Sequence, residues 1–122
     1  MVLVFNGYMS KEPISDEFLI ELLESYTSAE AAEIQQYLSE WDTATYTSVS
    51  QSILDHANRK GIDPLRYLRK AHNFNKKGAI RVPKTGYRGD SSAVYRKGNE
   101  YLIVRPDQYG TEKIVTYGVN DD

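Results

Sequence analysis

The chain contains two histidines, His56 and His72, and histidine is the side chain that most readily exchanges a proton near neutral pH. His72 follows a run of basic residues and precedes a segment, residues 73–77, that holds two lysines. It is therefore a candidate general acid or base, although a histidine at the end of a helix also stabilises the helix dipole. Both interpretations of His72 stay open. His56 lies beside Asp55 in an acidic segment, and we interpret it as a structural or surface residue.

Arginines and hydroxyl-bearing residues of the C-terminal half form a pattern suited to phosphate chemistry. Metal-free cleavage of RNA requires a base for the 2′-OH proton, an acid for the leaving oxygen and cations for the charge that develops on phosphorus. Arg81, Arg88 and Arg96 are candidate cations, because the planar guanidinium matches phosphate oxygens. Tyr95 or Tyr117 is a candidate for proton transfer or base stacking, and Thr116 for a hydrogen bond to phosphate. Each of these residue types is more often structural than catalytic.

Several kinds of chemistry are excluded by what the sequence lacks. There is no cysteine, which excludes disulfides, Cys-ligated zinc, iron–sulfur clusters and thiol catalysis. None of the motifs for nucleotide phosphates, zinc proteases, serine hydrolases or EF-hand calcium occurs. We therefore expect no metal and no cofactor. No apolar run is long enough to span a membrane, and the start lacks a signal-peptide pattern, so we expect a cytoplasmic protein without membrane contact.

The net charge of −2 conceals a division along the chain. Residues 1–57 hold one base and ten acids, whereas residues 58–105 hold thirteen bases and three acids. An asymmetry of this size indicates an interaction surface. The basic segment would contact either the phosphates of a nucleic acid or the acidic half of its own chain.

Helix signals occupy the first part of the chain and strand signals the rest, so we predict a single α+β domain over residues 1–122. About four helices, capped at Ser15, Thr27, Ser48 and Asp63, form an acidic half over residues 1–75. They pack on a small antiparallel sheet of about four strands in the basic half, residues 76–122. The expected strands cover residues 79–83, where Pro83 ends the strand, 92–97, 100–105 and 111–118, with residues 2–5 as a candidate extra edge strand.

Gly98 and Asn99 form a two-residue hairpin turn, and this turn fixes which side chains share a face of the sheet. We expect the helices to cover the face that carries Ala93, Tyr95, Leu102 and Val104. The opposite face carries Ser92, Val94, Arg96, Tyr101, Ile103 and Arg105. This second face is either an ordinary solvated surface, with Arg96 stacked on Tyr101, or a phosphate-binding surface. In the latter case the preceding loop adds Lys84, Tyr87 and Arg88.

Three stretches carry a family resemblance: YRGDSSAVYRK at residues 87–97, EYLIV at 100–104 and KIVTY at 113–117. Helices followed by a glycine-containing loop and an antiparallel sheet resemble the RNase superfamily that unites barnase, EndoU, colicin-type tRNases and RelE-like toxins. The resemblance covers residues 72–118. It implies a metal-independent endoribonuclease of the small bacterial or phage toxin type, with RNA as substrate and a cognate immunity protein or antitoxin as partner.

On this hypothesis the residues divide into two sets. The candidate catalytic residues are His72, Arg88, Arg96, Tyr95 and Thr116. The candidate nucleic-acid-binding residues are Lys70, Lys76, Lys77, Arg81, Lys84, Tyr87, Tyr101 and Arg105.

Two alternatives come from the same residues. The acidic half would suit a non-enzymatic inhibitor, carried by a phage or plasmid, that mimics nucleic acid and binds a host nuclease. The segment Tyr87-Arg88-Gly89 looks like the first-strand arginine of ADP-ribosyltransferases, but no Glu-x-Glu follows it.

Overall fold

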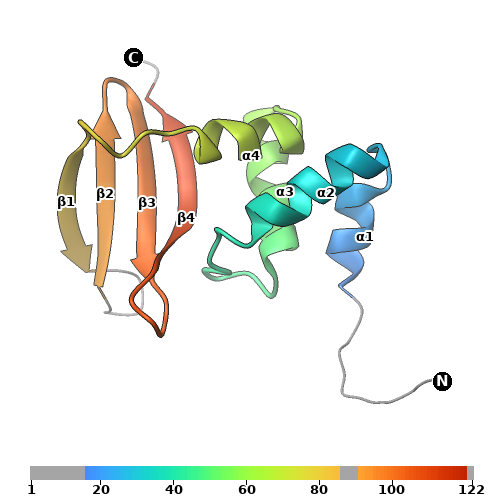
Figure 1. The fold of residues 1–122 in the computed structure, drawn as a ribbon, viewed down its shortest axis with the longest axis horizontal. Helices are drawn as coiled ribbons and strands as arrows, with labels where there is room; N and C mark the ends of the chain where they lie inside the picture. The colour runs from blue at the N-terminus through green and yellow to red at the C-terminus, as the bar shows by residue number, and fades with distance from the viewer. Residues whose placement is uncertain (1–15, 86–90, 121–122) are drawn as a thin grey trace.

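The computed structural model describes residues 16–85 and 91–120 and confirms the predicted α+β arrangement, with four helices followed by a four-stranded antiparallel sheet (Figure 1). The candidate strand at residues 2–5, together with Tyr87 and Arg88, lies outside the described residues. The helices are α1 (Glu17–Leu23), α2 (Ser28–Leu38), α3 (Val49–Lys60) and α4 (Pro64–His72). The strands are β1 (Ile80–Thr85), β2 (Ser91–Lys97), β3 (Glu100–Pro106) and β4 (Glu112–Val119), and they neighbour one another in chain order.

Polar side chains at the helix starts explain where the helices begin. The cap of α1 is Asp16, one residue later than predicted, and its carboxylate accepts two backbone N–H groups at 3.1 and 3.2 Å. The predicted caps Thr27, Ser48 and Asp63 are confirmed, and each accepts the backbone N–H three residues further on. α3 ends at Gly61, whose φ of 64° lies in the left-handed region that glycine adopts without strain.

Strand β1 is longer than the sequence predicted. It continues through Pro83 to Thr85 instead of ending at the proline. Proline is tolerated here because β1 is an edge strand, where a missing N–H need not interrupt a ladder. All six residues of β1 are exposed.

The β2–β3 hairpin has the predicted register, with Arg96 opposite Tyr101 and Tyr95 opposite Leu102. The face that we expected to be covered is buried in its centre, at Leu102 and at two residues on the same face. These buried residues are Ala93, Leu102 and Val104. The opposite face is less solvated than expected, because two of its residues are also buried: Ser92 and Val94.

The helices lie beside β4 and do not spread across the sheet (Figure 1). The segment after α2 runs along the open edge of β4: the Asp42 N–H donates to the Ile114 carbonyl, and the Ile114 N–H donates to the Glu40 carbonyl, both at 2.8 Å. The neighbouring Trp41 is buried in the core that joins helices and sheet. The acidic helical part therefore closes one edge of the sheet and leaves β1 at the other.

A single segment, residues 73–79, leads from α4 across the sheet to β1 (Figure 1). Phe74 anchors this crossing segment, because its ring packs edge-on against Tyr117 with centroids 6.5 Å apart. The crossing segment holds two lysines over the same face that carries Tyr95.

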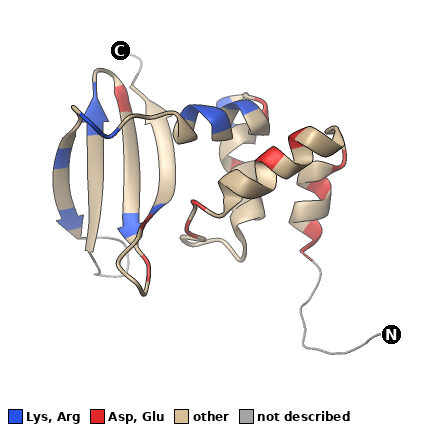
Figure 2. Cartoon of the chain, viewed as in Figure 1, with Lys and Arg blue, Asp and Glu red and all other residues tan. Residues whose placement is uncertain are grey.

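Charge is divided in space as it is along the chain. Figure 2 shows most acidic residues on α1, α2 and α3 and their connections, and most basic residues on α4, the crossing segment and the strands. None of the helices in the described part of the chain is long and apolar enough to cross a membrane.

Candidate functional site

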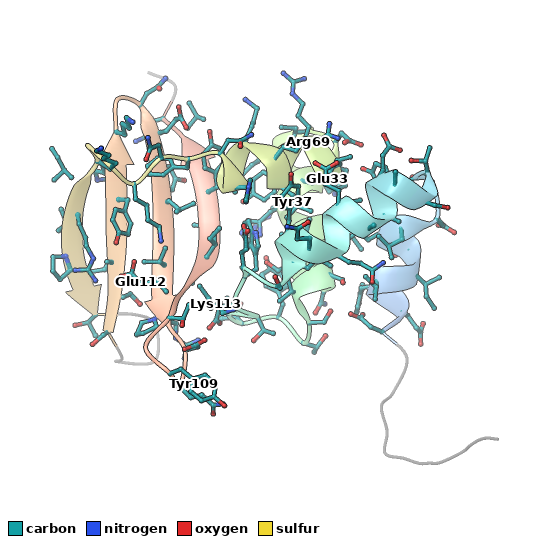
Figure 3. All side chains as sticks on the ribbon, in the orientation of Figure 1. Glu33, Tyr37, Arg69, Tyr109, Glu112 and Lys113 are labelled. Atoms are coloured by element: carbon teal, nitrogen blue, oxygen red, sulfur yellow. The ribbon has the colours of Figure 1, made fainter. Side chains whose placement is uncertain are left out.

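Four charged or hydroxyl-bearing side chains meet on the face of the sheet that carries Tyr95 and Leu102, which we call the inner face. We call these four residues the Glu112 cluster: Lys76, Arg81, Tyr95 and Glu112. The Tyr95 hydroxyl donates to Oε1 of Glu112 at 2.6 Å, and Arg81 donates to Oε2 at 2.9 Å. The Lys76 ammonium lies 3.6 Å from Oε1. Both cations also lie over the Tyr95 ring, at 5.1 Å for Lys76 and 5.9 Å for Arg81. Figure 3 shows Glu112 over the sheet, on the side that the crossing segment passes.

The sheet register and the crossing segment bring this cluster together. Arg81 of β1 lies directly opposite Tyr95 of β2, so their side chains leave the same face. Glu112 begins β4, two strands away from Tyr95, and Lys76 reaches the face from the crossing segment. The cluster therefore depends on four separate segments of the basic half.

The cluster combines a carboxylate, a neutral phenol and two cations at neutral pH. Burial raises the pKa of Glu112, but the hydrogen bonds from Tyr95 and Arg81 and the nearby charge of Lys76 lower it below its usual value on balance. Burial, followed by the hydrogen bond to Glu112, raises the pKa of Tyr95. The side chains of Arg81 and Lys76 remain 47% and 42% exposed, and that of Glu112 is 24% exposed, so an anionic ligand can reach them.

Glu112 was missed by the sequence analysis because a β-bulge decides which face it occupies. Ile103 pairs with Thr116, but its neighbour Val104 pairs with Ile114, so Val115 has no opposite residue. A strand without this bulge would place Glu112 on the other face of the sheet, since side chains alternate along a strand. No feature of the sequence marks the bulge.

His72 lies on the helical side of the crossing segment. Its Nδ1 is 2.9 Å from Oε2 of Glu40, and its ring centroid is 4.6 Å from that of Tyr37. The Glu40 carbonyl also accepts the Ile114 N–H, which links His72 to β4 two residues from Glu112. Among the described residues no hydrogen-bond partner occupies the other ring nitrogen of His72, and the side chain is 41% exposed.

A second group of a carboxylate, a tyrosine and an arginine lies between α2 and α4, away from the sheet (Figure 3). Glu33 accepts from Nε and Nη2 of Arg69 at 2.7 and 2.8 Å and from the Tyr37 hydroxyl at 2.8 Å. The bond from Arg69, followed by that from Tyr37, lowers the pKa of Glu33 to about 2. These bonds join two helices and neutralise the charge of Arg69.

The arginines predicted for the outer face have separate surroundings. Arg96 is exposed and lies 6.0 Å from the Tyr101 ring centroid, on the face opposite to Tyr95. Arg105 forms an ion pair with Asp42 at 2.9 Å, and the two side chains are only 13% and 16% exposed. Arg105 therefore connects the sheet to the segment after α2.

The remaining predicted residues are spread over the molecule. Thr116 lies beside the Tyr67 hydroxyl and forms a hydrogen bond with it. This bond and the one from the Tyr117 backbone lower the pKa of Tyr67, whereas burial raises it more. Three predicted nucleic-acid-binding lysines are exposed: Lys70, Lys77 and Lys84. The structure thus gathers three predicted residues, Lys76, Arg81 and Tyr95, around a carboxylate that was not predicted. Within the described ranges, His72, Arg96 and Thr116 form no hydrogen bond or ion pair with this cluster.

Comparison of the chain with protein-family models, with curated proteins and with solved structures gives no match. In the described part of the chain no group of three histidine or acidic side chains is arranged to hold a metal ion. The site is therefore interpreted from its own geometry.

Proposed function

We propose that this chain is a metal-independent endoribonuclease and that the Glu112 cluster is its catalytic site. The observation that carries the proposal is the position of the Glu112 carboxylate, 2.6 Å from the Tyr95 phenol and 2.9 Å from the Arg81 guanidinium on a partly open sheet face. A base, a proton donor and two cations are the groups that RNA cleavage by its own 2′-OH requires.

The cleavage step assigns one role to each group. The carboxylate of Glu112 accepts the proton of the ribose 2′-OH while the 2′-oxygen forms a bond to phosphorus. The bond from phosphorus to the 5′-oxygen breaks, and the Tyr95 phenol donates its proton to that leaving oxygen. The products are a 2′,3′-cyclic phosphate and a free 5′-OH. Lys76 and Arg81 stabilise the negative charge on the phosphoryl oxygens.

The charge balance of the cluster favours an anionic substrate. Two cations face one carboxylate, and the raised pKa of Tyr95 keeps its phenol neutral and able to donate. The requirement for a 2′-OH restricts cleavage to RNA. An enzyme of this kind acting in the cytoplasm would need a neutralising immunity protein or antitoxin in the cell that makes it.

The test is cleavage of a defined RNA in the presence of a chelator, with a DNA strand of the same sequence as the negative substrate. We expect wild type to cut the RNA and leave a 2′,3′-cyclic phosphate. Glu112→Gln and Tyr95→Phe should each lower kcat by about 10²- to 10⁴-fold, the usual contribution of a general base or acid.

The chain supplies its own matched control. Glu33 also accepts from an arginine and a tyrosine, but between two helices, so Glu33→Gln should leave the rate unchanged. Loss of activity in His72→Ala with full activity in Glu112→Gln would transfer the site to His72 and refute this assignment. A wild-type protein that cuts no RNA but captures a nuclease would refute the enzyme and support the inhibitor.

A further inference from the structure

A cleft of about 460 Å³ lies between α4 and the β3–β4 end of the sheet. Arg66, Arg69, Lys70 and Asn73 line it from the helix side, and Glu100 and Tyr117 line it from the sheet. The four helix-side residues occupy positions i, i+3, i+4 and i+7, so they share one face of α4 and of the turn that follows it. The Tyr117 hydroxyl donates to Glu100 at 3.0 Å.

Basic side chains outnumber acidic ones in the lining of the cleft, since Arg66, Arg69 and Lys70 stand against one lining carboxylate, Glu100. Arg69 is neutralised by Glu33, but in the described part of the chain the Arg66 and Lys70 side chains have no ion-pair partner. The helix dipole does not explain Arg66 either, because it lies in the first turn of α4, where a cation is unfavourable. Two exposed cations held over a polar cleft make a binding place for phosphate.

The cleft and the Glu112 cluster share one row of paired residues across the sheet. Tyr95 of the cluster is opposite Leu102, and Leu102 is opposite Tyr117 of the cleft. Two strand spacings separate Tyr95 and Tyr117, a distance of ~10 Å. The crossing segment joins the two places directly, since Asn73 lines the cleft and Lys76 belongs to the cluster.

We propose that this cleft is a second phosphate subsite, which holds the backbone of a single RNA strand away from the bond that is cut. The identity of the ligand as RNA rests on the proposed function. Because the two places are separated by ~10 Å across the sheet, a strand must carry at least one phosphate besides the one that is cut in order to contact both. Arg66 and Lys70 bind the remote phosphate.

The proposal predicts a dependence on substrate length that a purely structural role would not give. In the double variant Arg66→Ala/Lys70→Ala, the KM for an RNA of about ten nucleotides should rise about 10- to 100-fold, the value of one or two charge-assisted hydrogen bonds. The kcat should stay unchanged. For a dinucleotide substrate, which cannot reach the cleft, kcat/KM should equal that of wild type. The matched control is Arg59→Ala/Lys60→Ala, which removes the same charge from the end of α3.

A binding experiment separates this proposal from the nuclease itself. The probe is a 2′-O-methyl RNA of about ten nucleotides, which cannot be cleaved, measured by fluorescence anisotropy at several salt concentrations. The slope of log K against log salt should be smaller by about 0.7 in the α4 variant, since one phosphate is no longer neutralised, and should match wild type in the α3 control. This result would support the cleft even if wild type cut no RNA. Equal affinity and equal slope in both variants, or an equal loss in both, would refute it.

Discussion

The hydroxyl of Tyr67 on α4 forms the two backbone hydrogen bonds with Tyr117 of β4 that a neighbouring strand would otherwise form. It donates to the Tyr117 carbonyl at 3.1 Å and accepts from the Tyr117 N–H at 3.2 Å. Both backbone groups face the edge of the sheet that the helices close, and Tyr67 itself is 1% exposed. A single phenol thereby satisfies two buried polar groups that would otherwise lack partners.

Replacing Tyr67 by phenylalanine should therefore cost more than the loss of one ordinary hydrogen bond. Tyr67→Phe keeps the ring in the core but leaves the N–H and C=O of Tyr117 unpaired, and we expect the free energy of unfolding to fall by about 2–3 kcal/mol. Urea denaturation measures this change. Tyr109→Phe is the control, because Tyr109 is 83% exposed and should lose almost nothing. Equal stability of the two variants would show that the edge of β4 is satisfied in another way.

The ion pair between Arg105 and Asp42 is the second link between sheet and helices. Its two side chains are mostly buried, and Asp42 also accepts the Ala44 N–H at 2.7 Å. Asp42→Asn keeps the shape but removes the charge that faces Arg105. We expect a loss of about 1–3 kcal/mol in unfolding free energy, measured by urea denaturation. The exposed pair of Arg59 with Asp55 provides the comparison, and Asp55→Asn should lose less. A larger loss in Asp55→Asn would contradict the structural role given to Arg105.

Local signals in the sequence predicted the elements of this fold well. Three of the four expected helix caps and the β2–β3 register are confirmed, because a side-chain cap and a two-residue turn act within a few residues of the chain. Pro83 misled the prediction of β1, because whether a proline ends a strand depends on the neighbouring strands.

The site depended on features that local patterns do not encode. The bulge at Val115 moves Glu112 to the face of Tyr95, and a one-residue shift reverses every side chain beyond it. Arg105 was predicted to bind RNA, but its ion-pair partner Asp42 is 63 residues away in the chain. Lys76 joins the cluster only because the crossing segment passes over the sheet.

Gly118 of β4 lies directly opposite Tyr101 of β3, and the Tyr101 ring passes close over it. A Cβ at this position would overlap the hydroxyl end of the Tyr101 ring, so Gly118→Ala must displace that ring. We expect a loss of about 1–3 kcal/mol in unfolding free energy, as in other overpacked sites. The double variant with Tyr101→Ala should recover much of that loss, because the obstacle is then absent. Strictly additive effects in denaturation would show that the ring moves freely and that Gly118 has another role.

The pH dependence of cleavage distinguishes Glu112 from His72 as the base. A general base must be deprotonated, so activity is lost as the pH falls through its pKa. Bonds from Tyr95 and Arg81, with the charge of Lys76, outweigh burial and hold the pKa of Glu112 below its usual value, so kcat/KM for a dinucleotide should stay level from pH 7 into the acid range and fall at a lower pH than for an ordinary glutamate base. A histidine base would instead lose activity near pH 6.5. At the alkaline end the donor Tyr95 must stay protonated, and its raised pKa places that loss above pH 10. Rates are measured against Glu112→Gln as the background of spontaneous RNA hydrolysis. An acid limb that disappears in His72→Ala would refute Glu112 as the base.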